Sequence, residues 1–234
     1  MRLTVISDDK PGRKNLVAKH SLSLLVERDM ELYLFGMGVD HVVLEHNAKE
    51  LGVDLDIVDY VVVSHDHVPH YGGFRHLSSV APFTDVFIPY GTAESLGRLL
   101  ARNGLRPREV TTWIKVSEGV YISRPFYGPP YEHFAVFLHG DELVVLSGCM
   151  HPGLEALTKI SEFFGKKIRA IIGGFHLVNA PDDVVNSYAK YLVERVQPSL
   201  VIPLHCSGER FLRELEKLGE VEVLELATGD RITV

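Results

Sequence analysis

Cysteine is scarce in this chain of 234 residues, which holds only Cys149 and Cys206. Two cysteines cannot build the disulfide framework of a small secreted domain, and in the cytosol they stay reduced. No apolar run approaches the roughly 20 residues that a membrane-spanning helix needs. The first residues also lack the long apolar region of a signal peptide. These absences predict a cytoplasmic protein without a membrane partner.

Positive charge is also limited, because 24 Lys and Arg stand against 31 Asp and Glu, for a formal net charge of -7. Nucleic-acid-binding surfaces are basic, so this balance disfavours a nucleic-acid partner and favours a small-molecule substrate. Hydrophobic residues at 46% and charged residues at 24% are typical of a globular protein. The composition does not indicate an oligomeric state.

The order of predicted elements changes at mid-chain, from mainly strands to helix–strand alternation. Strands are expected over residues 3–7, 21–27, 31–35, 60–63, 85–89, 134–139 and 142–147, with two more within 111–122. Helices are expected at 40–51 behind an Asp40 cap, at 74–79, and at 92–103 behind a Thr92 cap. The second half alternates helices near 153–164, 182–197 and 208–218 with strands 168–172, 200–203 and 221–226. No linker or repeat interrupts this order, so we predict one domain over residues 1–234. The predicted fold class is α+β, a four-layer αββα sandwich with helices outside two sheets.

The most informative segment follows the apolar run Tyr60–Val63, whose composition is that of a strand buried on both faces. His65, His67 and His70 come directly after it, before the Gly72–Gly73 turn. The carboxyl ends of strands are where α/β folds place their ligands. In extended backbone His65 and His67 point the same way, and His70 follows on the next turn. Three neutral imidazoles at this spacing indicate a site for zinc or iron rather than an ordinary polar loop.

Three further apolar strands end in the same manner, with small and polar residues that include histidine. The residues after these strands are Cys149 and His151, then His176, then His205 and Cys206. A single histidine of this kind is usually a hydrogen-bonded core residue. Because all of them stand at the same point of a strand, we expect the four strand ends, including that of Tyr60–Val63, to converge at one edge of a sandwich.

These motifs carry a resemblance to a known family. Residues 65–73 resemble the His-x-His-x-Asp-His signature of the metallo-β-lactamase superfamily, with its trailing glycines. The motifs at 148–151, 173–177 and 205–208 are typical of a smaller group within the superfamily: Gly-Cys-x-His, Gly-Gly-Phe-His-Leu and His-Cys-Ser-Gly. They are similar to those of the branch typified by 7,8-dihydropterin-6-methyl-4-(β-D-ribofuranosyl)aminobenzene 5′-phosphate synthase, a branch also labelled metal-dependent hydrolases.

The resemblance implies two groups of metal ligands, drawn from several strand ends. They are His65, His67 and His151 for a first ion, and His70, His205 and Cys149 for a second. His176 is implied to lie in the pocket as a ligand, an acid or base, or a substrate contact. Asp66 points away from its neighbours in extended backbone, which favours a structural hydrogen-bonding group. It could instead act as a base, or replace the carboxylate lost at Pro69 if the loop turns.

The segment departs from the family pattern where the family carries aspartate. Pro69 and Gly36 replace two carboxylates, and Cys149 stands where many members carry the aspartate that bridges two metals. Carboxylates offset the charge of two close cations. We therefore expect one tightly bound divalent ion, zinc before manganese or iron, and a weak or empty second site.

The resulting functional hypothesis is a metal-dependent hydrolase or transferase that acts on a small ester-like substrate, a phosphoester, through a metal-bound hydroxide. Two alternatives stay open. The missing aspartates favour a degenerate homologue that binds a ligand or partner without turnover. Cys149 and Cys206 would instead suit an iron-dependent redox protein.

Overall fold

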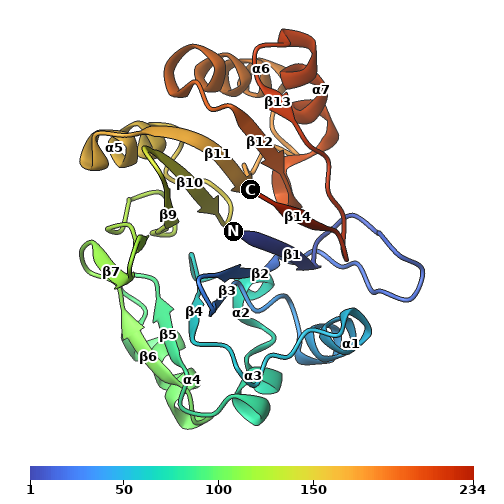
Figure 1. Cartoon of the computed structure of the whole chain (residues 1–234), viewed down its shortest axis with the longest axis vertical. Helices are drawn as coiled ribbons and strands as arrows, with labels where there is room; N and C mark the ends of the chain where they lie inside the picture. Colours follow the sequence, from blue (N-terminus) through green and yellow to red (C-terminus); the bar gives the residue numbers. More distant parts are fainter. The chain divides into compact units, whose positions relative to one another are not determined.

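The computed structural model describes residues 1–234, the whole chain (Figure 1). The chain forms two compact units, the first from residues 1–111 with 226–234 and the second from residues 112–225. Each unit holds one seven-stranded sheet and its own hydrophobic core. The single domain over residues 1–234 stays a prediction.

The sheet of the first unit is mixed, in the strand order β14-β1-β2-β3-β4-β5-β6. Its strands are β1 (Arg2–Ser7), β2 (Ser23–Arg28), β3 (Glu31–Phe35), β4 (Tyr60–Val62), β5 (Asp85–Ile88), β6 (Arg106–Glu109) and β14 (Arg231–Thr233). Strands β3 to β6 run parallel, whereas β14, β1, β2 and β3 pair antiparallel. This arrangement places the carboxyl end of β4 at an edge formed by parallel strands.

Two strands of this sheet were not predicted. β6 has the sequence Arg-Pro-Arg-Glu, which lacks alternation, and its proline suits only an edge strand. Arg106 and Arg108 hold it to the neighbouring strand through Asp85, at 3.5 and 2.9 Å. β14 is three residues long and pairs with β1, so it is recognisable only from its partner.

The helices of the first unit confirm one predicted cap and correct another. They are α1 (His41–Leu51), α2 (Val68–Tyr71), α3 (Phe74–Val80), the π-helix η1 (Ala93–Gly97) and α4 (Arg98–Arg102). Asp40 Oδ1 accepts a hydrogen bond from Val43 N at 2.8 Å, and Gly52 ends α1 at a positive φ of 62°. The Thr92 hydroxyl does not cap its helix but donates to Pro89 O at 2.6 Å.

The second unit has a sheet in the order β13-β12-β11-β10-β9-β8-β7. Its strands are β7 (Ile114–Ser117), β8 (Val120–Ile122), β9 (Ala135–His139), β10 (Glu142–Ser147), β11 (Lys167–Gly173), β12 (Leu200–Pro203) and β13 (Glu222–Val223). Strands β7 to β10 form an antiparallel meander, and β10 to β13 run parallel. The helical elements are α5 (Glu155–Phe164), α6 (Asp182–Tyr191), η2 (Leu192–Val196), η3 (His205–Ser207) and α7 (Glu209–Leu218).

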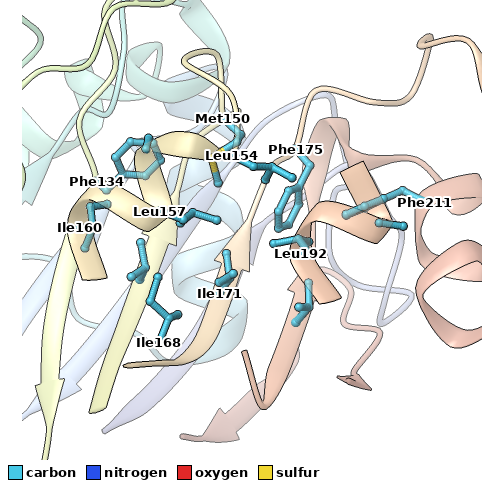
Figure 2. Close-up of a cluster of buried hydrophobic side chains, with 14 of the residues drawn as sticks. Phe134, Met150, Leu154, Leu157, Ile160, Ile168, Ile171, Phe175, Leu192 and Phe211 are labelled. Atoms are coloured by element: carbon cyan, nitrogen blue, oxygen red, sulfur yellow. The ribbon is translucent and has the colours of Figure 1, made fainter. Parts of the chain in front are cut away.

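The core of the second unit lies between its sheet and its helices. Figure 2 shows Ile168 and Ile171 of β11 among side chains from the helical elements. Phe175, just after β11, packs its ring 4.8 Å from that of Phe211 on α7, and both are buried. This packing fixes the helices over the parallel strands whose ends carry the predicted site residues.

The same two-layer arrangement recurs in the first unit, where residues of α1, α3 and α4 pack on one core with residues of the sheet. The predicted α+β class is thereby confirmed. None of the helices combines the length and the apolar character that a transmembrane helix requires.

Phe211→Ala tests this core. Removing a fully buried phenylalanine ring leaves a cavity, so we expect the free energy of unfolding to fall by about 3–5 kcal/mol. Phe163 is 54% exposed and stacks on Trp113, so Phe163→Ala should cost about 1 kcal/mol or less. Urea unfolding followed by circular dichroism measures both; equal losses would contradict this account of the core.

Candidate functional site

In the first unit, three imidazoles gather beyond the end of β4. The ring centroid of His65 lies 4.8 Å from that of His67 and 4.1 Å from that of His70. His65 and His70 are buried, whereas His67 is exposed. The backbone reaches this arrangement by a bend rather than by the expected extended path, because His67 N donates to His65 O at 3.0 Å. The structure thus brings the three predicted residues together within this unit.

The local backbone structure explains why proline stands at position 69 and why glycines follow His70. Pro69 lies in the first turn of α2, where a missing N–H has no cost. Its carbonyl accepts a hydrogen bond from Leu22 N at 3.1 Å. A Cβ on Gly72 would lie 1.8 Å from Val39 O, so only glycine admits this approach. Proline and glycine in this loop therefore orient His70 rather than add a ligand.

The donor chemistry of this group fits a divalent ion such as zinc. Neutral imidazole is the commonest protein ligand for zinc. The Ser64 hydroxyl lies 3.0 Å from Nδ1 of His65, a contact of the kind that fixes the tautomer and orientation of a ligand ring.

Asp66 lies between two of these histidines and is partly buried. Desolvation raises the pKa of its carboxyl, while the charge of His67 lowers it. Burial raises the pKa of the nearby Tyr71 hydroxyl, and the charge of Asp66 acts in the same direction. Burial thus favours the protonated form of the Asp66 carboxyl relative to its carboxylate.

In the second unit, the ends of three adjacent parallel strands meet. Ser147 of β10, Gly173 of β11 and Pro203 of β12 stand in register, and the residues beyond them form one cluster. The possible ligand atoms of Cys149, His176 and Cys206 all lie within 4.8 Å of one another. The ring of His151 lies 4.6 Å from that of His176, and buried His205 immediately precedes Cys206.

This cluster contains unusual backbone conformations. Met150, His176 and His205 have positive φ values of 58°, 56° and 52°. Residues other than glycine seldom adopt this region, and such conformations gather at functional sites. The three positions follow three different strands and belong to the same cluster, which supports a functional reading of this edge.

The Cys206 thiol is strongly affected by its neighbours in the cluster. Its Sγ lies 3.3 Å from Sγ of Cys149 and accepts a hydrogen bond from His176 N at 3.2 Å. Hydrogen bonding with Cys149 and His176 lowers the pKa of the Cys206 thiol well below its ordinary value, against the effect of burial. Reciprocally, the hydrogen bond to Cys206 raises the pKa of His176.

Glu132 is a site residue that the sequence did not reveal. Its buried carboxylate accepts four successive backbone N–H groups: Oε1 from Gly148, Cys149 and Met150 at 2.9, 2.9 and 3.2 Å, and Oε2 from His151 at 2.8 Å. Burial raises the pKa of Glu132 to about 7, although these donors lower it. The carboxylate fixes the loop that carries two predicted ligands. The only sequence signal is a charged residue three positions before the first residue of β9, a mostly buried strand.

His133, the next residue, is fully buried, and neither ring nitrogen has a hydrogen-bond partner. Burial lowers the pKa of this imidazole to about 3. His133 is therefore neutral at pH 7.

A family model described as the metallo-beta-lactamase superfamily matches residues 19–154, more than half of the chain. The chain belongs to this superfamily. The matched segment includes the histidine group of the first unit and the loop of Cys149 and His151 in the second.

Individual relatives and a solved structure match this chain over most of its length. An uncharacterised protein of Methanocaldococcus jannaschii is 26% identical, over 90% of this chain and 92% of the relative. The 7,8-dihydropterin-6-methyl-4-(beta-D-ribofuranosyl)-aminobenzene-5'-phosphate synthase of the same organism is 24% identical, over 96% of each chain. A solved structure described as a metal-dependent hydrolase of the beta-lactamase superfamily has a TM-score of 0.85 at 23% identity, and covers 100% of this chain and 99% of the other. These comparisons confirm the metallo-β-lactamase fold that the resemblance implied.

The buried His133 predicts a defined pH dependence. Its pKa in the folded state lies below the ordinary 6.5, so the unfolded chain binds this proton first as the pH falls. The stability associated with the neutral ring is therefore complete above pH 6.5 and is lost below it. Relative to His133→Leu, the free energy of unfolding of the wild type should fall by about 2 kcal/mol between pH 7.5 and pH 5. Urea titrations of both proteins measure this, and a pH-independent difference would contradict it.

Proposed function

We propose that this superfamily member is a metal-dependent hydrolase or transferase that acts on a small ester-like substrate, a phosphoester. The observation that carries the proposal is the close approach of the imidazoles of His65, His67 and His70 beyond β4. The segment that the family model matches includes all three residues. The similarity to a synthase with a phosphate in its name supports the phosphoester class.

The proposed ion is zinc, with manganese and iron as alternatives. His65 and His67 are its first ligands, and the family resemblance adds His70, His151, His205 and Cys149 as candidates. Such an ion, when bound, lowers the pKa of water toward about 7 and polarises a phosphoryl oxygen. The sequence also led us to expect one tightly bound ion, because carboxylates are missing at Pro69 and Gly36.

Two side chains of the protein are proposed to move protons. His176 has a raised pKa because Cys206 accepts its hydrogen bond, so more of its imidazole is protonated near neutral pH and able to donate to a leaving group. Asp66, whose carboxyl has a pKa raised by desolvation, is the candidate base. Each side chain would exchange a proton with the substrate from its own loop.

A second candidate function is ligand binding without turnover. Pro69 lies in the first turn of α2 and Gly36 has a positive φ of 74°, so both positions of missing carboxylates have structural roles instead. A cytoplasmic location and a small-molecule partner remain proposals that rest on the composition.

Metal analysis tests the hydrolase proposal. We expect His65→Ala combined with His67→Ala to lose one metal ion per chain relative to the wild type, because two imidazole ligands are removed. His41→Ala combined with His46→Ala removes two histidines of α1 and should leave the metal content unchanged. Elemental analysis of the purified, reconstituted proteins measures this.

Activity is then assayed on a panel of phosphate esters. We expect chelation to abolish wild-type turnover and added metal to restore it, since the reaction depends on the ion. Turnover that survives metal removal would exclude the hydrolase proposal. A wild type that keeps its metal but turns over no ester would favour the binding protein.

A further inference from the structure

The second unit contains a group of soft ligands that the proposed function leaves partly unused. Cys149, His176 and Cys206 offer two sulfur atoms and one imidazole within 4.8 Å of one another. Both sulfurs are buried, whereas His176 is exposed. A buried thiol pair with an imidazole at the protein surface is the composition of a metal site with an open position.

The sheet explains why these three residues meet. Each lies two or three residues beyond the last residue of one of three neighbouring parallel strands: β10 before Cys149, β11 before His176 and β12 before Cys206. Adjacent parallel strands present their carboxyl ends at the same edge. The cluster therefore follows from strand order and register and does not depend on the first unit.

Glycine makes room for the second sulfur. A Cβ on Gly174 would lie 2.8 Å from Sγ of Cys206 and 2.2 Å from Gly148 O. The Cys206 sulfur thus lies against bare backbone, where it also accepts the N–H of His176 at 3.2 Å. A backbone donor to a thiolate is a typical outer contact of a sulfur ligand.

We propose that Cys149, His176 and Cys206 form a thiolate-rich zinc site within the second unit. Two sulfurs and one nitrogen select zinc over harder ions such as magnesium or manganese. Tetrahedral Zn–S bonds of about 2.3 Å separate two sulfurs by about 3.8 Å. The observed Sγ–Sγ distance is 3.3 Å, so binding requires the two thiols to part by about half an ångström.

This site goes beyond the proposed function. It shares Cys149 with the metal ligands that the family resemblance implies, whereas Cys206 is not in that set. It assigns His176 the role of a ligand, which the resemblance left open, in place of the proton donor proposed above. It requires neither hydrolysis nor the histidines of the first unit, so it is testable by the coordination of the metal alone. If both sites fill, the chain holds two ions, and the expectation of one tightly bound ion is wrong.

The experiment uses full-length protein, reduced under anaerobic conditions, with both thiols counted by alkylation after unfolding. Cobalt(II) replaces zinc as the probe, because thiolate ligands give it an intense charge-transfer absorption in the near ultraviolet. Wild type, His65→Ala with His67→Ala, Cys206→Ser and His139→Ala are titrated. His139 is an exposed histidine at the end of β9, which makes His139→Ala a matched control.

We expect the thiolate absorption in the wild type, in His139→Ala and in the His65/His67 double variant, and about half of that intensity in Cys206→Ser. Absence of the absorption from the wild type, or full intensity in Cys206→Ser, would overturn the proposal. Zinc X-ray absorption on the His65/His67 double variant counts the ligands without a cysteine variant. Two sulfur neighbours at about 2.3 Å support the site, and one or none excludes it.

Discussion

The carboxyl ends of β10, β11 and β12 approach one another closely because Gly173 and Gly174 carry no side chain. A Cβ on Gly173 would lie 1.9 Å from Ser147 O, and one on Gly174 would lie 2.2 Å from Gly148 O. These distances are impossible for any other residue, so the glycine pair determines where β11 ends relative to its neighbour. The loops beyond the three strands therefore lie at the same edge of the sheet. The cluster of Cys149, His176 and Cys206 in the second unit depends on this close approach of the strands.

A buried carboxylate holds the most important of these loops. Four consecutive N–H groups from Gly148 to His151 point at Glu132, an arrangement that resembles an anion-binding nest filled by the protein itself. Buried backbone donors require acceptors, and no strand or helix supplies them here. Glu132 therefore replaces regular secondary structure as the means of fixing Cys149 and His151. This explains how a loop outside the strands and helices can hold Cys149 and His151 in place.

Sequence patterns predicted those features whose cause is local. Asp40 and Gly52 delimit α1 because capping is a contact within one turn, and His65, His67 and His70 lie together because they are close in sequence. Features with a distant cause were missed. β14 and β6 are strands only through their partners, and Glu132 acts on a loop 16 to 19 residues away. The contact between Cys149 and Cys206 was missed for the same reason, since the two residues are 57 positions apart in the sequence.

The two cysteines also change how the missing aspartates should be weighed. The expectation of a weak second metal counted only carboxylates as negative ligands. By that count, Pro69 and Gly36 leave the chain with too little negative charge to offset two metal ions. A zinc-bound cysteine is a thiolate and carries the same formal charge as a carboxylate. In the proposed thiolate site, Cys149 and Cys206 together would offset the charge of one dication. On that proposal, the missing oxygen ligands of the first unit and the paired sulfur of the second would change the metal preference of the chain rather than abolish metal binding.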